Sequence, residues 1–424
     1  MKDAGNIRVL KMDRANLSNL SKEIGNLKNL ERLSLEGNML SSLPKEIGNL
    51  KNLVYIDLSR NKFKSYPKEI FKLKNLTALA FCNNYELTSN LPKEIGELKN
   101  LIYLSLTESQ LSILPEEIGE LKNLTSLNLD GNQFSILPEE IGELKNLTNL
   151  NLDGNQFSIL PEEIGELKNL TNLSLNSNQL SNLPKEIGEL KNLTSLYLHG
   201  NQFRILPKEI GKLKSLKNLS LYHNQLNSLP KEIGELKNLT SLYLDGNQLS
   251  SLPKEIGELK NLVVLSLLAN QLSSLPKEIV KLENLEELRF GGNTYKGKEA
   301  IKNKFKELGL LSLPSSTVSE ETLIERQKKG LENARRFVEE TKRRLAEENS
   351  TRNTACNSCD GNGKCSWCFG HGRKECLRCN GDGKNYLSGF TERLCEACNA
   401  KGWNLCDACM GSKTCNSCKG SGYK

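Results

Sequence analysis

The chain has few aromatic residues, few histidines and no long run of apolar residues. Of its 424 residues 5% are aromatic, and only three are histidine. A membrane-spanning helix needs about 18 or more consecutive apolar residues, and no such run occurs. The first residues, MKDAGNIRVLKMD, lack the apolar stretch of a secretory signal. We therefore predict a cytoplasmic protein that has no membrane partner.

Sequence signatures of catalysis are also missing. The chain contains no G-x-x-x-x-G-K-[ST] phosphate loop, no Ser/His/Asp signature and no pair of carboxylates set apart for acid–base work. Acidic pairs such as Glu116 and Glu117 recur throughout the chain, and we expect them to be solvated. The sequence predicts a protein that is not an enzyme. A thiol–disulfide oxidoreductase, which would use a labile C-x-x-C pair, is the enzymatic alternative.

The main feature of the chain is a repeat of 23 residues, LPKEIGELKNLTSLYLDGNQLSS. Proline recurs at this spacing from Pro92 to Pro276. One longer step of 25 residues precedes Pro92 and places two extra residues around Tyr85. Thirteen copies of the core pattern L-x-x-L-x-L-x-x-N can be aligned over residues 7–293. A fixed period of this length is typical of a solenoid.

The spacing within the unit predicts the local structure. In L-x-x-L-x-L the last two leucines are two residues apart, which indicates a short strand that buries alternate residues. Asparagine stands at the ninth position except at Ala15 and Ser109, and its amide can bond buried backbone groups. Proline suits the first position of a short helical turn. Because only stacked units can bury the leucines, we predict an α/β solenoid with a curved parallel sheet on its concave face.

The repeat resembles the LPxEIGxLxNLxxLxLxxNxL unit of bacterial leucine-rich repeat proteins, which are in turn similar to the intracellular Ras-related repeat proteins of plants. The resemblance covers residues 7–293, and we assign residues 1–295 to this solenoid. It implies a protein-recognition scaffold without catalysis, and it says little about the partner. Two stretches, 124–146 and 147–169, differ at a single position, so we expect little specificity from them.

Aromatic residues are concentrated at predicted concave positions of the repeats. Tyrosine and arginine at the centre of a surface patch are common anchors of protein interfaces. We therefore predict a protein-binding patch around repeats nine to eleven; the alternative is that tyrosine merely suits a half-exposed strand. A metal site at the two histidines and a nucleophilic Cys82 find less support. The candidate residues are Tyr55, Tyr103, Tyr197, His199, Tyr222, His223 and Tyr243.

Residues 296–352 form a predicted helical cap followed by a charged helical linker. In 319–348 favourable i,i+4 pairs such as Glu339 and Arg343 indicate a solvated helix. Ile324, Leu331, Val338 and Leu345 recur every seven residues, but polar or small residues fill the other core position. A coiled-coil dimer through 319–348 therefore stays an alternative.

Twelve of the thirteen cysteines form six C-x-x-C pairs within residues 353–424. Two such pairs make one tetrahedral Zn(Cys)₄ site, so the sequence predicts three zinc ions. A disulfide framework is the alternative, but it suits a secreted protein. Few large apolar residues occur in this segment, so metal would supply its stability. The predicted ligands are Cys356, Cys359, Cys365, Cys368, Cys376, Cys379, Cys395, Cys398, Cys406, Cys409, Cys415 and Cys418.

The gaps between successive pairs are 5, 7, 15, 7 and 5 residues, which is a palindrome. A ribbon folded at its middle predicts nested pairing: first with sixth, second with fifth, third with fourth. Sequential pairing fits the palindrome too, although a five-residue gap leaves little chain to bring two pairs face to face. Trp367 and Trp403 favour nesting weakly, because nesting would bring both near one zinc ion.

Four of the pairs read C-x-x-C-x-G-x-G, which resembles the cysteine-rich zinc domain of DnaJ-type co-chaperones. That resemblance implies nested pairing and some affinity for non-native proteins. The chain departs from the family pattern: it has six pairs instead of four, Ala400 and Lys413 replace glycines, and no His-Pro-Asp tripeptide is present. Nucleic-acid binding by this module is an alternative without a basic stripe to support it. A possible apolar surface comprises Trp367, Phe369, Tyr386, Leu387, Phe390 and Trp403.

The formal charge of +7 depends on how the cysteines are counted. Four thiolates around one Zn²⁺ carry a net charge of about −2. Three such sites would bring the whole chain close to neutral. The apparent basicity is therefore poor evidence for a nucleic-acid partner.

Overall fold

The computed structural model describes residues 6–293 and four short strands between residues 394 and 421. The chain divides into two compact units, Met1–Leu313 and Pro314–Lys424, and each is described by itself. The predicted cap, the charged linker and most of the cysteine-rich segment lie outside the described residues.

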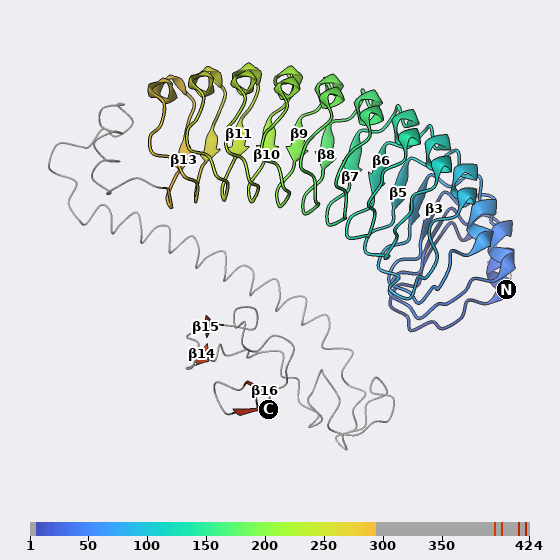
Figure 1. Cartoon of the computed structure of the whole chain (residues 1–424). Helices are drawn as coiled ribbons and strands as arrows, with labels where there is room; N and C mark the ends of the chain where they lie inside the picture. Colours follow the sequence, from blue (N-terminus) through green and yellow to red (C-terminus); the bar gives the residue numbers. More distant parts are fainter. Residues whose placement is uncertain (1–5, 294–393, 396–399, 402–413, 416–419, 422–424) are drawn as a thin grey trace. The chain divides into compact units, whose positions relative to one another are not determined.

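The repeats build one parallel sheet of thirteen strands, which are arranged in sequence order along the inner side of an arc (Figure 1). Each strand is three residues long. The predicted fold class, a leucine-rich repeat solenoid with a concave parallel sheet, is confirmed. The strands are β1 (Val9–Lys11), β2 (Arg32–Ser34), β3 (Tyr55–Asp57), β4 (Ala78–Ala80), β5 (Tyr103–Ser105), β6 (Ser126–Asn128), β7 (Asn149–Asn151), β8 (Asn172–Ser174), β9 (Ser195–Tyr197), β10 (Asn218–Ser220), β11 (Ser241–Tyr243), β12 (Val264–Ser266) and β13 (Glu287–Arg289).

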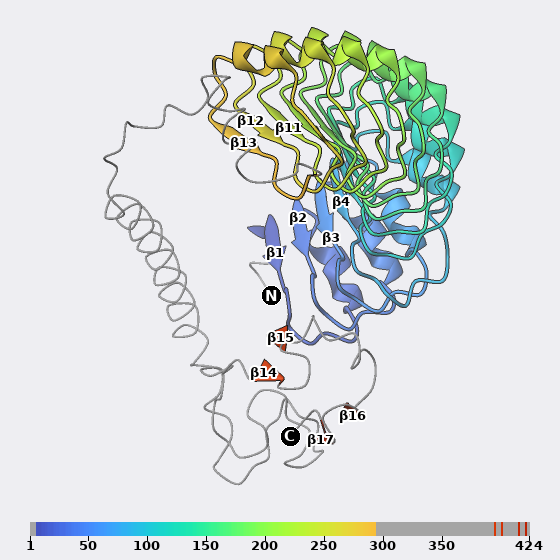
Figure 2. The same ribbon diagram turned by 60° about the vertical axis from the view of Figure 1, so that its left-hand side comes forward.

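Twelve helical turns lie on the outer side of the arc, and all are five-residue 3-10 helices (Figure 2). We predicted proline at the first helical position, and this is wrong by one residue. Pro44, for example, is extended, with ψ at 146°, and its carbonyl accepts from Ile47 at 3.0 Å. The turns are η2 (Lys22–Asn26), η3 (Lys45–Asn49), η4 (Lys68–Lys72), η5 (Lys93–Glu97), η6 (Glu116–Glu120), η7 (Glu139–Glu143), η8 (Glu162–Glu166), η9 (Lys185–Glu189), η10 (Lys208–Lys212), η11 (Lys231–Glu235), η12 (Lys254–Glu258) and η13 (Lys277–Lys281).

The strands pair so that equivalent repeat positions face each other. Leu219 of β10 lies opposite Leu196 and Leu242 on the neighbouring strands. The register also holds across the 25-residue step, where Leu79 pairs with Leu104. The extra residues are therefore accommodated outside the sheet, around the exposed Tyr85, whose hydroxyl donates to Glu108 at 2.8 Å.

The core consists of stacked leucine, isoleucine and phenylalanine side chains between the sheet and the outer turns. Leu127, Leu129 and Ile141 show how one repeat contributes from both its strand and its turn; their exposed fractions are at most 1%. Burial of such side chains stabilises by about 1.5–3 kcal/mol each, which one coil alone could not obtain. The stacking of repeats is thus the origin of stability.

The asparagines at position nine bond backbone groups of two adjacent repeats, as predicted. The Nδ2 of Asn132 donates to the carbonyls of Leu106 and Leu129 at 2.8 and 2.9 Å. Its Oδ1 accepts from the amide of Leu111 at 3.0 Å. Where serine replaces asparagine, the Oγ of Ser109 donates to the Phe81 carbonyl at 3.0 Å, so part of the arrangement persists.

Four two-residue strands are described in the C-terminal unit. β14 (Leu394–Cys395) pairs with β15 (Ala400–Lys401), and β16 (Thr414–Cys415) pairs with β17 (Gly420–Ser421), both antiparallel. The register is the same in both hairpins: the first cysteine of a C-x-x-C pair lies opposite the residue five positions later.

Candidate protein-binding surface

We number positions from the first leucine of L-x-x-L-x-L-x-x-N, and each repeat carries the number of its strand. Three positions of each repeat point to the concave side of the sheet. Because strand residues alternate between faces, positions three, five and seven lie opposite the buried leucines at positions four and six. Position eight, which follows, has a positive φ at every repeat from the first to the last; it is a glycine in six repeats and His223 in repeat ten, with φ at 53°. The side chains at these four positions are the ones that a partner on this face would meet.

The seven predicted residues do not form one row. Tyr55 and Tyr103 stand at position three of repeats three and five, where Ala78 of β4 separates them. The ring of Tyr55 is already covered, because the Arg32 guanidinium lies 4.3 Å from its centroid. These two tyrosines therefore lie apart from the other five.

The other five predicted residues gather on repeats nine to eleven, and we call them the aromatic patch. His199 stacks on Tyr222 with their ring centroids 4.2 Å apart and an angle of 8° between the planes. His223 meets the edge of Tyr222 at 5.4 Å. The patch comprises Tyr197, His199, Tyr222, His223 and Tyr243.

Tyr197 and Tyr243 flank a single serine. Both pair in register with Ser220 of β10, so the two tyrosines lie two strand spacings apart, about 10 Å. Ser220 points to the concave side, yet its Oγ is buried and has no hydrogen-bond partner within the described part of the chain. A small residue thus separates two large rings at the centre of the patch.

Burial lowers the pKa of His199, and the nearby His223 lowers it further, whereas Asp153 opposes both effects. The imidazole is therefore disposed to stay neutral near physiological pH. Its backbone amide donates to the Oδ1 of Asn176 at 3.0 Å. A neutral His199 adds a flat aromatic surface to the patch without adding positive charge.

Carboxylates flank the aromatic patch, and we did not predict them as site residues. Position seven reads, from repeat six to repeat eleven, Asp130, Asp153, Asn176, His199, Tyr222 and Asp245. These carboxylates could have been found in the sequence. Reading the residue at position seven through successive repeats gives the column of side chains that lie next to one another on the concave face.

Asp153 and Asp245 also support the backbone of the next repeat. Asp153 accepts from the amide of Asn176 and from the hydroxyl of Ser174, both at 2.7 Å. Asp245 accepts from the amide of Leu268 at 2.7 Å. Burial, followed by the charges of Asp153 and Glu108, raises the pKa of Asp130. This part of the face therefore holds negative charges that repel one another.

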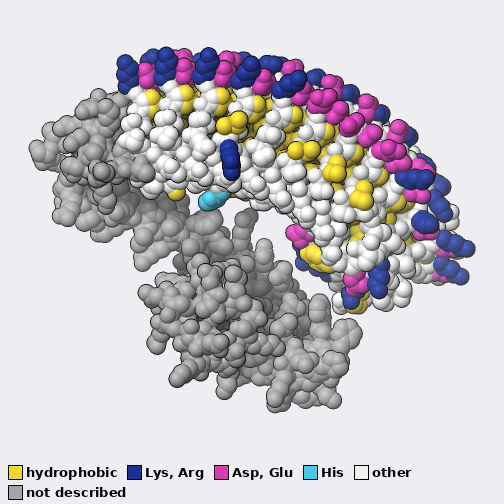
Figure 3. All heavy atoms as spheres, viewed as in Figure 1, with side chains coloured by type: hydrophobic (Ala, Val, Ile, Leu, Met, Phe, Trp, Pro, Cys, Tyr) yellow, Lys and Arg dark blue, Asp and Glu magenta, His cyan; other side chains and the backbone are white. Residues whose placement is uncertain are grey.

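The outer side of the solenoid carries a different pattern of charge. Lysine and glutamate alternate along the ridge formed by the turns (Figure 3). Ion pairs connect successive repeats there, for example Lys122 with Glu143 at 2.8 Å and Lys214 with Glu235 at 2.7 Å. Such exposed pairs contribute little specificity or stability.

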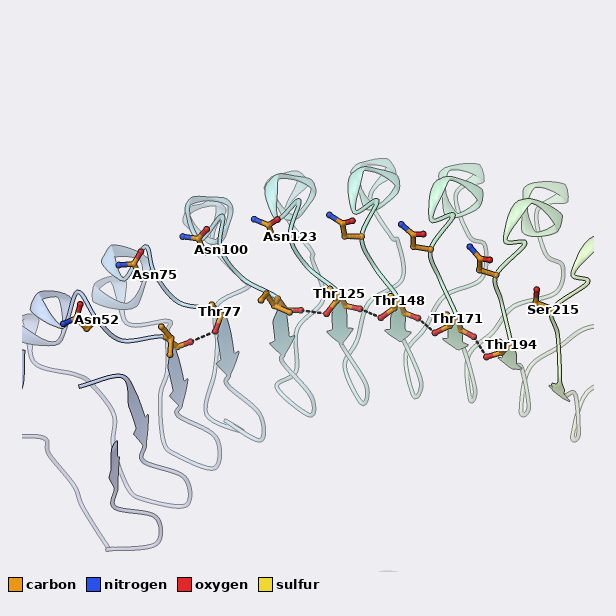
Figure 4. A pocket seen from close by; sticks show the side chains of 15 residues that line it. Asn52, Asn75, Thr77, Asn100, Asn123, Thr125, Thr148, Thr171, Thr194 and Ser215 are labelled. Atoms are coloured by element: carbon orange, nitrogen blue, oxygen red, sulfur yellow. Dashed lines mark hydrogen bonds between the residues drawn. The ribbon is translucent and has the colours of Figure 1, made fainter. Parts of the chain in front are cut away.

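A groove of about 1120 Å³ runs along one flank of the solenoid, and none of the five patch residues lines it (Figure 4). Its polar groups are engaged within the fold. Thr148 donates to the Thr125 carbonyl at 3.0 Å, and Asn146 donates to the Lys122 carbonyl at 2.8 Å. The groove therefore reflects the stacking of repeats, and we do not assign a ligand to it.

The other predicted sites are Cys82, the histidine metal site and the cysteine-rich zinc module. Cys82 follows β4 and is half-buried, with its Sγ 3.1 Å from the Oγ of Ser105. Among the described residues, no three His, Cys, Asp or Glu side chains are placed to hold a metal ion, and no helix is long and apolar enough to cross a membrane. The twelve predicted zinc ligands, Trp367 and Trp403 lie outside the residues whose side chains are described.

Comparison with known proteins identifies the class to which this fold belongs. A family model described as a leucine-rich repeat region matches residues 3–101, 82–156 and 149–245, and a second leucine-rich repeat model matches residues 237–294. The chain belongs to the leucine-rich repeat family. Members of this family are interaction domains. No curated protein matches the chain.

Solved structures of bacterial leucine-rich repeat proteins are similar to this chain. The chain is 40% identical to a leucine-rich repeat protein of Leptospira interrogans, covering 72% of this chain and 95% of the other at a TM-score of 0.51. An internalin of Listeria monocytogenes shares the fold at 22% identity and a TM-score of 0.57, over 68% of this chain and 88% of that one.

A plant structure is also similar. The ectodomain of the Arabidopsis thaliana receptor kinase GASSHO1/SCHENGEN3, solved in complex with Casparian strip integrity factor 2, is 31% identical, with a TM-score of 0.50. The match covers 66% of this chain and 40% of that one.

Proposed function

We propose that this protein is a non-enzymatic interaction scaffold whose aromatic patch binds a protein partner. The observation that carries the proposal is the stacked pair of His199 and Tyr222, flanked by Tyr197 and Tyr243 on the concave face. Aromatic residues are rare in this chain, and partly exposed clusters of them are typical anchors of protein interfaces. The plant ectodomain that resembles the solenoid is itself solved in complex with another factor, which supports a partner of this kind.

The repeats offer substitutions that leave the scaffold intact. Serine stands at position five in repeats eight, ten and twelve, and asparagine stands at position seven in repeat eight. Tyr197→Ser, Tyr222→Asn and Tyr243→Ser therefore replace the patch with residues that the same fold already carries. Tyr55→Ala combined with Tyr103→Ser is the matched control, because it removes tyrosines from the concave face outside the patch.

The test is affinity capture with the tagged full-length chain from a lysate of the source cells, read by quantitative mass spectrometry. We expect the wild type and the control variant to retain a defined set of proteins. The captured amount of these proteins should be at least tenfold lower with the triple patch variant. Equal capture by all three chains would contradict the proposal. Circular dichroism of each variant checks that the solenoid remains folded.

We further propose that residues 353–424 form a zinc module that serves as a second docking surface, with a DnaJ-like affinity for non-native proteins. Its support is the six C-x-x-C pairs and their palindromic gaps. The fourth and sixth pairs begin at Cys395 and Cys415 on hairpins of equal register, which is what equivalent zinc-binding loops would require. Zinc thiolates need reduced cysteines, so the proposal places the chain in a reducing compartment such as the cytoplasm.

A further inference from the structure

The aromatic patch lies on a face whose charge has one sign. In repeats five to eleven, positions three, five, seven and eight include four carboxylates but neither lysine nor arginine. Within residues 6–293, none of the three aspartates of this face forms an ion pair with a lysine or arginine. The carboxylates are Glu108, Asp130, Asp153 and Asp245.

Other parts of the concave side carry their own cations. Near the N-terminal end, Arg32 covers Tyr55, and Arg60 lies 3.7 Å from Glu36. Arg289 on β13 interacts electrostatically with Asp245 and Tyr243, but its guanidinium is paired with Glu287 at 2.7 Å. The acidic character is therefore specific to the middle repeats, where the aromatic patch lies.

We propose that the partner of this face is a basic, extended polypeptide segment that lies across the strands from repeat seven to repeat eleven. The inference rests on the proposed function and specifies the chemistry of the partner. A cationic side chain is attracted both by aspartate and by the face of a tyrosine ring. The contact between Arg32 and Tyr55 is an example of such an arrangement within this fold.

The spacing of the carboxylates defines the segment more closely. Asp153 and Asp245 are four strands apart, which corresponds to about 19 Å. An extended chain advances about 3.3 Å per residue, so six residues cover that span. Arginines at positions i and i+6 would reach the two aspartates from the same side of the segment. Of the apolar residues at i+2 and i+4, one would then lie over the aromatic patch and the other near repeat eight.

Two substitutions remove the carboxylates of repeats seven to eleven from this face and keep an acceptor for the next backbone amide. Asn176 occupies the same column as the aspartates, and its Oδ1 accepts from the next amide at 3.0 Å, so asparagine can replace aspartate there. Asp153→Asn with Asp245→Asn is the test variant. Glu139→Gln with Glu162→Gln, on the exposed first turn residues of η7 and η8, removes the same charge from the outer side and is the matched control.

The measurement is the binding of labelled peptides to the full-length chain by fluorescence anisotropy. The probe is Arg-Ser-Leu-Ser-Leu-Ser-Arg, and the comparison peptides carry glutamine or glutamate in place of both arginines. We expect the arginine peptide to bind at least tenfold more tightly than the glutamine peptide, and more weakly as salt rises. The aspartate variant should abolish that preference, whereas the control variant should retain it.

Several results would overturn the inference. Equal binding of the three peptides, or an equal loss in the control variant, would show that arginine is not recognised by this face. A change in the elution volume of the aspartate variant without a change in peptide binding would indicate that the chain itself covers the face. If the arginine peptide fails while patch-dependent capture of proteins persists, the proposed function stands and the basic partner is rejected. If the arginine peptide does not bind and protein capture does not depend on the patch, the basic partner and the proposed function are both rejected.

Discussion

At the scale of single residues, one repeat position has two different structural roles. Asn176 and Asp153 at position seven each bond the backbone of the following repeat. His199 and Tyr222 stand in that column and stack on each other instead. A position that elsewhere supports the fold is used here for an aromatic surface, which is the kind of local departure expected at a functional site.

Asp130 provides a prediction at this scale, because its pKa is raised by burial and by the charges of Asp153 and Glu108. A carboxyl whose pKa is higher in the folded than in the unfolded state lowers stability when it is ionised. Asp130→Asn should therefore raise the unfolding free energy at pH 7 by about 0.5 kcal/mol, the scale of a part-exposed charge pair. The gain should shrink as the pH falls through the pKa of folded Asp130.

Thermal or urea unfolding of the full-length chain between pH 4 and pH 7 measures this difference. Glu139→Gln on the outer turn is the control, and we expect it to change stability less. A loss of stability at pH 7 in the Asp130 variant would show that the carboxylate is favourably paired.

At the scale of elements, the outer turns pack so closely that most of them need glycine at the same position. A Cβ built on Gly165 of η8 would lie 2.6 Å from the Glu186 carbonyl oxygen of the next turn. Phe71 replaces this glycine in η4, just before the 25-residue step. Val280 replaces it in η13, the last described turn, where the side chain is 43% exposed. Glycine is thus required where the backbone of the next turn comes within contact distance of a Cβ, as at Gly165.

Gly165→Ala should therefore lower the unfolding free energy by about 1–3 kcal/mol, the usual cost of overpacking. Gly48→Ala is the matched control, because its Cβ would meet the flexible Lys72 side chain, at 3.2 Å, before any backbone atom. Urea titration followed by circular dichroism compares the two variants. Equal destabilisation of both would mean that close approach of the next turn's backbone is not what selects the glycine.

At the scale of the whole molecule, the chain divides into two units, and we propose that they differ in their source of stability. The solenoid is stabilised by leucines buried between stacked repeats. The C-terminal segment has few large apolar residues, and we propose that zinc stabilises it instead. The two units should therefore respond differently to removal of metal.

We expect three zinc ions per chain by inductively coupled plasma mass spectrometry, and fewer than two would contradict the ligand assignment. Nested pairing places Cys356 and Cys415 in one site, so the double variant Cys356→Ser/Cys415→Ser should retain two ions. Sequential pairing predicts that only one remains. Cys82→Ser, in the solenoid, is the control and should retain all three. A chelator should abolish binding of non-native proteins while leaving the solenoid's circular dichroism unchanged.

The fold was largely predictable because a repeat imposes the same interactions thirteen times. Leucine spacing indicated the strands, and asparagine at position nine indicated the backbone bonds that Asn132 makes. The position of proline was missed by one residue, since a fixed φ suits both the residue before a helical turn and its first residue. A patch on repeats nine to eleven was also predicted from the sequence. The stacking of His199 on Tyr222 within it was not, because ring orientation is set by the tertiary structure.

The periodicity of leucine, asparagine and proline was sufficient to establish a stacked solenoid, because each unit must bury its apolar side in its neighbours. Periodicity alone could not show which exposed side chains meet. The stack of His199 on Tyr222 depends on ring orientation, and the sharing of one face by Asp153, Asp245 and the aromatic patch depends on register across five strands. The scarce aromatic residues and histidines are informative because the parallel register brings residues 23 positions apart into contact.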